Sequence, residues 1–178
     1  VGAQLIAAHP DPATLTPLKL GGELPQALRE RLKLDQALPK AHRLALLEEL
    51  NEAHCGHAPP AIAEAMLKAQ RLKDAWMAES VLNAPHTTVL IVGRGHVHPQ
   101  RGIPWAIDLL SHELADENQA KVHVLSLSPS RQPSSSADQG MMSQLIVAPH
   151  RQDNPCERFR EQLKRMRERR GVHTHSKE

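Results

Sequence analysis

Apolar residues recur at helical spacing along much of the chain, and two segments show this most clearly. In segment 40–53, leucines at positions 44, 46, 47 and 50 gather on one face, which predicts an amphipathic helix. Segment 60–82 has a broader apolar face and begins with prolines that suit a first helical turn, so it predicts the longest helix. Further helices are expected over 103–114 and 156–170, and segment 13–40 is helical in tendency but is interrupted by proline and glycine.

Shorter apolar runs predict β-strands at four places. These runs are 4–8, 87–92, 121–127 and 144–148. The second run is rich in β-branched residues, which is typical of a strand buried on both faces. Strands that alternate with helices predict an α/β fold with a mostly parallel sheet flanked by helices.

The predicted domain organisation is a single α/β domain over 1–150, followed by a basic helix and tail over 151–178. Segment 128–140, rich in serine, proline and glutamine, is expected to be a surface loop. Four strands are few for such a sheet, so we expect an N-terminal strand–helix section to be missing. No internal repeat is visible.

Composition narrows the possible chemistry. The 178 residues carry a net charge of +2, which gives no reason to expect a nucleic-acid partner. There are twelve histidines but no tyrosine, so imidazole chemistry is well supplied and tyrosine chemistry is excluded. No apolar run reaches the roughly 20 residues that cross a bilayer. Cys55 and Cys156 could form one disulfide or none.

Two polar residues interrupt the apolar face of the predicted helix 60–82. Gln70 and Asp74 are four residues apart and therefore neighbours on that face. Because a buried carboxylate without a partner is costly, we expect Asp74 to meet a cation, a hydrogen-bond donor or water. The plainer interpretation is that both side chains tie the helix to the backbone of a loop.

A glycine-rich turn follows the predicted strand 87–92. Gly93 and Gly95 allow a sharp turn close to a ligand, and the carboxyl end of a parallel strand is where ligands collect. His96 would lie at this site, able to bind a metal, hydrogen-bond a carboxylate or move a proton. The plainer alternative is a polar surface loop. A dinucleotide fingerprint is excluded, because His98 stands where the pattern requires glycine.

The remaining candidates are weaker. His54, Cys55 and His57 are too few and too close for a structural zinc site, although they could contribute to a site shared with His96. No zincin or serine-hydrolase motif is present. The basic segment 156–170 is expected to be a solvated helix face, with binding to an anionic membrane surface as the alternative.

Two linked motifs resemble a known family. Gln70, Asp74, Met77 and Ala78 give the pattern Gln-x3-Asp-x2-Met-Ala, and Gly-x-Gly-His-Val and Arg-Gly-Ile-Pro follow within 93–104. This combination is similar to the ChaN family, haem-binding and iron-regulated lipoproteins of Gram-negative bacteria that share a fold with Tiki-type and erythromycin-esterase-like proteins. The resemblance implies that the following residues line or shape the pocket: Gln70, Asp74, Met77, Gly93, Gly95, His96, Gly102 and Pro104.

The chain also departs from the family pattern. Family members begin with a strand that bears a Leu-Gly-Glu-x-His-type motif, which this sequence lacks. A tyrosine is associated with the haem iron in the family, and this chain has none. The resemblance therefore makes His96, His54, His57 and Met77 the candidate axial ligands. Two arginines, Arg94 and Arg101, are candidates to pair with the haem propionates.

The resemblance implies a haem carrier in haem and iron uptake, not an enzyme. It further implies a periplasmic location, a lipid anchor in the outer membrane, a homodimer and an outer-membrane haem-uptake system as partner. One alternative is a metal-dependent hydrolase in which His96 and His54 bind the metal and Asp74 serves as the orienting carboxylate. The other is a truncated, inactive relative that associates through an unpaired sheet edge.

Overall fold

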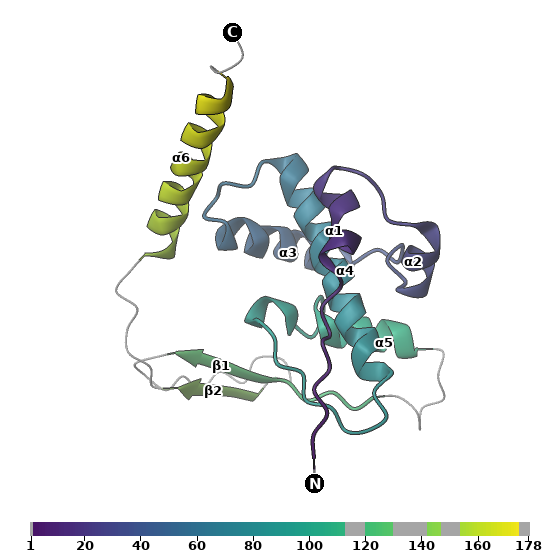
Figure 1. Ribbon diagram of the computed structural model, residues 1–178. Coiled ribbons are helices and arrows are strands. Elements are labelled where there is room, and N and C mark those ends of the chain that lie inside the picture. The colour runs from purple at the N-terminus through teal and green to yellow at the C-terminus, as the bar shows by residue number, and fades with distance from the viewer. Residues whose placement is uncertain (1, 113–119, 130–141, 147–153, 175–178) are drawn as a thin grey trace.

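The computed structural model describes residues 2–112, 120–129, 142–146 and 154–174 (Figure 1). Most of these residues are helical. In chain order the elements are α1 Pro12–Lys19, α2 Gln26–Arg31, α3 Lys40–Ala53, α4 Pro60–Leu82, the short 3-10 helix η1 Arg94–His96, α5 Ile103–Ser111, β1 Leu125–Pro129, β2 Met142–Ile146 and α6 Pro155–Thr174.

The predicted helices are confirmed, except that the helix predicted over 103–114 ends at Ser111, one residue before this stretch of described residues ends. α3 and α4 have the bounds that the apolar pattern predicts, and α6 contains the whole predicted segment 156–170. The interrupted segment 13–40 forms the two short helices α1 and α2. Positions 113–114, and the predicted loop 128–140 from residue 130 onward, lie outside the described residues.

The predicted fold class is wrong: the described residues do not form a mostly parallel sheet flanked by helices. Their only strand pairing is between β1 and β2, which are parallel, with Leu125 opposite Met142. Segments 4–8 and 87–92 form neither helix nor strand, and no described strand lies beside them. A run of β-branched residues favours an extended backbone, but a sheet also needs neighbouring strands to complete its hydrogen bonds. Here Val89 and Ile91 are 85% and 92% exposed instead of buried.

The core lies between helices, with α4 at the centre of the helical part and α1, α3 and α5 around it (Figure 1). Leu72 and Ala78 on α4 are fully buried, and Leu32 after α2 is almost so. They belong to one cluster with residues of α1 and α5. A smaller cluster of Leu38, Leu46 and Leu67 holds α3 against α4. Burial of this apolar surface is the main stabilising contribution.

The basic helix α6 stands apart from the other helices (Figure 1). A disulfide between Cys55, in the turn after α3, and Cys156, in the first turn of α6, links it to the helical part. This settles the pairing that the sequence leaves open. No helix in the described part of the chain is both long and apolar enough to cross a membrane. The division into a domain over 1–150 and a tail over 151–178 stays a prediction.

Candidate functional site

The candidate site lies where α4 meets the turn that carries η1. Gln70 and Asp74 occupy successive turns of α4 on the face toward this turn, as their four-residue spacing requires. Asp74 is 2% exposed, and its Oδ1 lies 2.5 Å from Nδ1 of His96. Nε2 of Gln70 lies 2.9 Å from the same nitrogen and 3.2 Å from the carbonyl oxygen of Gly95, to which it donates. The structure thus brings together four of the predicted residues.

The hydrogen-bond partner of Asp74 is therefore a side chain, while Gln70 donates to the loop backbone at Gly95. A carboxylate that accepts from an imidazole N–H fixes the ring in one orientation. With Asp74 ionised, Nδ1 of His96 donates its proton, and Nε2 keeps a lone pair. Nε2 forms no hydrogen bond with any described residue. His96 is consequently oriented to offer one ring nitrogen to a ligand.

The carboxyl of Asp74 is strongly perturbed by its surroundings. Burial raises the pKa of Asp74 from 3.8 to about 6. The hydrogen bond to His96 and the charges of His96, Lys73 and Arg71 lower the pKa but do not cancel the effect of burial. The second oxygen, Oδ2, is buried and has no hydrogen-bond partner among the described residues. A buried carboxyl that is only half satisfied is more typical of a functional pair than of a packing contact.

The turn that carries His96 is held by Gly102, the residue before α5. A Cβ at Gly102 would lie 2.3 Å from the carbonyl oxygen of His96 and 2.9 Å from the backbone nitrogen of His98. The amide of Gly102 also donates to the carbonyl of His98 at 2.8 Å. No larger residue fits this contact, so glycine at position 102 allows the turn to pack closely against the start of α5.

The two glycines of the predicted turn, Gly93 and Gly95, are less constrained than Gly102. Neither Gly93 nor Gly95 has a positive φ, and a Cβ at either position would meet at most an ordinary contact. The turn itself therefore does not require them. Their lack of side chains leaves the surface beside His96 open.

Three further predicted residues lie in surroundings that differ from those of the His96–Asp74 pair. Met77 is 5% exposed within the main core, so its sulfur is not presented to a ligand. Arg101 forms an ion pair with Glu49 and lies 2.7 Å from Nε2 of His98, so it is already engaged. Arg94 is exposed on η1 and forms no ion pair with the described residues.

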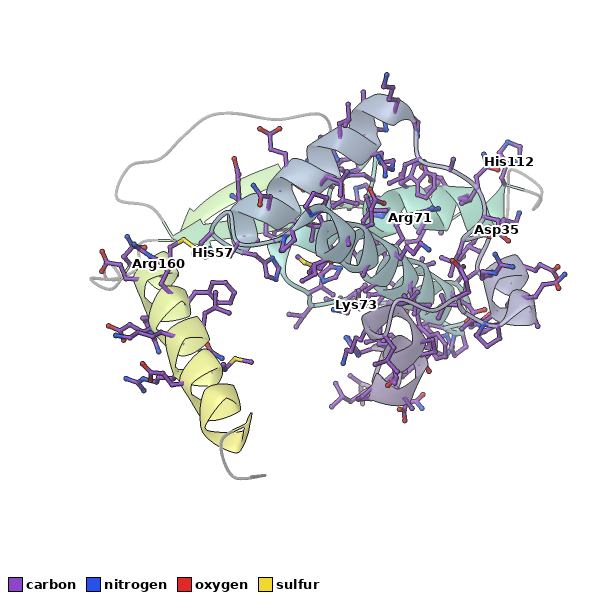
Figure 2. All side chains as sticks on the ribbon, turned by 90° about the horizontal axis from the view of Figure 1, so that it is seen from above. Asp35, His57, Arg71, Lys73, His112 and Arg160 are labelled. Atoms are coloured by element: carbon purple, nitrogen blue, oxygen red, sulfur yellow. A yellow bond between two sulfur atoms is a disulfide. The ribbon has the colours of Figure 1, made fainter. Side chains whose placement is uncertain are left out.

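His54 and His57 lie in a separate cluster beside the disulfide. Their rings are 6.2 Å and 6.1 Å from the ring of Phe159 on α6. Figure 2 shows His57 at this end of the molecule, near the start of α6. No contact joins either histidine to His96 within the described part of the chain, and the sulfur of Cys55 is bound to Cys156. Among the described residues there is no group of three or more side chains arranged to hold a metal ion.

A groove that the sequence does not indicate lies next to the turn. It has a volume of about 790 Å³ and is lined by Val97, Ile103 and Ile107, and by residues of segments 87–92 and 120–125. His86 and His123 also line it. Isolated histidines in extended segments carry no signal in a sequence, which is why neither was a candidate. Of the residues in the family pattern, Val97, Ile103 and Pro104 line this groove, whereas His96 does not.

The sequence profile of a family described as "Haem-binding uptake, Tiki superfamily, ChaN" matches residues 2–107, which is more than half of the chain. The chain therefore belongs to this family, and the resemblance noted from residues 70–104 is confirmed. No curated protein and no solved structure matches the chain significantly.

Proposed function

We propose that this member of the ChaN family binds haem and that Nε2 of His96 would be a ligand of the iron. The observation that carries the proposal is the hydrogen bond between Nδ1 of His96 and the buried Asp74. Histidines that bind metals almost always donate their other ring proton to a carboxylate or a carbonyl, which orients the ring and makes the ligating nitrogen more basic. Histidine is also the commonest protein ligand of haem iron.

The donor set of this chain fits haem in two further respects. Nε2 of His96 is not used by any described residue, so an iron would displace no existing contact. The neighbouring groove, to which Val97 contributes but His96 does not, falls in the size range of small-molecule sites. Its lining mixes apolar residues such as Ile103 and Ile107 with polar ones such as Glu79 and His123. When bound, the haem would supply iron for transport or redox chemistry. The chain's own residues would orient the ligand and exclude water from Asp74.

The propionates need cations, and the arginines of the site differ in how available they are. Arg94 is exposed and unpaired among the described residues, so we propose it as the propionate partner. Arg101 could do this only by leaving Glu49.

We also propose that the protein handles haem in uptake without transforming it, in the periplasm and as a homodimer. The family description supports haem uptake. The periplasmic location, lipid anchor, homodimer and outer-membrane partner rest on the sequence resemblance alone.

Haem titration followed by visible absorption tests the proposal. Wild-type protein should saturate with a shifted Soret band, and His96→Ala should change the band or abolish saturation. Asp74→Asn keeps the shape of the side chain but loses its charge, and should weaken affinity about 10- to 100-fold, the usual effect of losing such a partner. His112→Ala, at an exposed position after α5, is the matched control. Retention of the wild-type spectrum and affinity by a folded His96→Ala variant would refute the assignment.

The His96–Asp74 pair also favours a second candidate function, that of a metal-dependent hydrolase. A histidine oriented by a carboxylate can act as a general base as well as a ligand. Emission spectroscopy of purified protein distinguishes the two, because stoichiometric zinc or manganese together with no haem binding would support the hydrolase.

A further inference from the structure

The basic helix α6 carries an apolar stripe along one side. Phe159, Leu163 and Met166 recur at helical spacing and therefore lie on the same side of the helix. At the base of α6 the ring of Phe159 lies beside the rings of His54 and His57. Beyond this base Leu163 is half-buried and Met166 is 46% exposed, where α6 stands apart from the other helices (Figure 1, Figure 2).

The charged residues of α6 are ordered around this stripe. At about 100° per residue, Arg160 and Lys164 lie along one edge of the stripe. Arg158 and Arg165 lie along the other edge, and all four side chains are exposed. The glutamates of the helix are also exposed and lie on the side opposite the stripe: Glu157, Glu161 and Glu168. Cations therefore border the apolar stripe, while the carboxylates face away from it.

This order suits a helix that lies flat on the surface of a lipid bilayer. Lys and Arg beside an apolar stripe can lay their methylene stems along it while their charged ends reach outward. At a bilayer surface the stripe would enter the boundary between head groups and acyl chains, and the cations on both edges would meet lipid phosphates. The glutamates would stay on the water side, so they would not repel an anionic surface.

The distribution of charge indicates that the surface is anionic. The sequence of α6 contains seven Lys or Arg and three Glu, a net charge of +4, whereas the whole chain carries only +2. Positive charge is thus concentrated on this helix, and the rest of the chain is slightly negative. A cluster of about four to eight cations on an amphipathic helix is typical of binding to anionic lipids. A nucleic acid would engage the cations but would leave the apolar stripe in water.

We infer that α6 binds the surface of an anionic phospholipid bilayer, with Leu163 and Met166 at the head-group boundary and the flanking cations on lipid phosphates. The attraction is chiefly electrostatic, and the stripe fixes which side of the helix meets the lipid. The disulfide between Cys55 and Cys156 ties the base of α6 to the helical part, so the bound helix would hold the rest of the protein at the membrane. The inference does not depend on haem, since His96 lies outside α6.

The experiment is co-sedimentation of the whole chain with vesicles of phosphatidylcholine, alone or mixed with phosphatidylglycerol, at low and at high salt. Lys164→Gln removes a cation beside the stripe, and Lys19→Gln makes the same change at an exposed position on α1. Leu163→Gln interrupts the stripe, and Glu161→Gln removes a carboxylate from the opposite side of α6. Far-UV circular dichroism checks the fold of each variant, and fluorescence anisotropy with a labelled DNA duplex tests a nucleic-acid partner.

We expect binding to the mixed vesicles at about 0.1 M salt and its loss at about 1 M salt, where the Debye length falls from about 10 Å to about 3 Å. Lys164→Gln should weaken partitioning about fivefold and Leu163→Gln about tenfold. Lys19→Gln should bind like wild type, and Glu161→Gln at least as tightly.

Four results would overturn the inference. The first is that wild-type protein does not bind the mixed vesicles, or binds phosphatidylcholine alone equally well. The second is that Lys164→Gln binds like Lys19→Gln, and the third is that a folded Leu163→Gln variant binds like wild type. The fourth is that the DNA duplex binds more tightly than the mixed vesicles at equal phosphate concentration, which would assign α6 to nucleic acid instead.

Discussion

The buried carboxyl of Asp74 makes the stability of the protein depend on pH in a specific direction. Below about pH 4 the carboxyl is protonated in both the folded and the unfolded chain. Between about pH 4 and pH 6 the unfolded chain releases its proton first, because burial raises the folded-state pKa from 3.8 to about 6. The folded state then binds more protons, so the free energy of unfolding falls as pH rises through this window.

The magnitude follows from the size of the shift. A rise of about two pKa units, at about 1.4 kcal/mol per unit, amounts to about 3 kcal/mol of lost stability at pH 7 relative to pH 3. Asp74→Asn has no titrating carboxyl and should lack this loss. As the pH rises through this window, the free energy of unfolding of Asp74→Asn should therefore increase by about 3 kcal/mol relative to that of wild type.

Urea unfolding followed by far-UV circular dichroism, repeated from pH 3.5 to pH 7, measures this difference. Asp108→Asn, at an exposed carboxyl on α5, controls for a simple change of charge. In the His96→Ala background the loss should be larger and extend to higher pH, because both effects of His96 lower the pKa of Asp74. Parallel pH profiles for wild type and Asp74→Asn would refute the reasoning.

Two further perturbations follow from the described contacts. Gly102→Ala places a Cβ against the carbonyl of His96, so we expect a displaced turn and about 1–3 kcal/mol of destabilisation. Urea unfolding measures the destabilisation, and loss of the Soret change on haem addition reports the displaced turn. Wild-type behaviour in both assays would contradict the steric argument. Reduction of the Cys55–Cys156 disulfide opens the long loop that the bond closes in the unfolded chain. The loss of stability should be well below the roughly 4–5 kcal/mol expected for a constraint of this length, because α6 gains freedom in the folded state too. Hydrogen exchange should show α6 released while α4 stays protected, and equal exchange of α6 before and after reduction would count against this.

The sequence predicts the helices well because helical periodicity is local. The bounds of α3 and α4 follow from apolar spacing and from proline at their starts. Sheet formation is not local, since segment 87–92 becomes a strand only if another segment lies beside it. The described residues provide none, so the predicted sheet is not formed although the segment is rich in β-branched residues.

The candidate site was predictable in part for a similar reason. The spacing of Gln70 and Asp74 within an apolar face predicts a buried carboxyl in need of a partner, and the structure supplies one. The identity of that partner depends on how the turn of residues 93–98 sits on Gly102, a backbone contact that no pattern of side chains reveals. The suggested site shared by His54 and His96 rested on residue type alone, and in the structure His54 lies beside Phe159 and not beside His96.

The placement of the tryptophans has a spectroscopic consequence. The chain has no tyrosine and only two tryptophans, Trp76 on α4 and Trp105 on α5, and both pack against the main core. Each indole also lies under a guanidinium, that of Arg31 at 5.2 Å and that of Arg71 at 5.5 Å. All intrinsic emission of the protein therefore originates from the helix pair that holds Asp74. A porphyrin bound beside this pair would quench that emission by energy transfer. Single Trp→Phe variants would then show how much each indole contributes to the quenching, with the protein's own fluorophores as the probe.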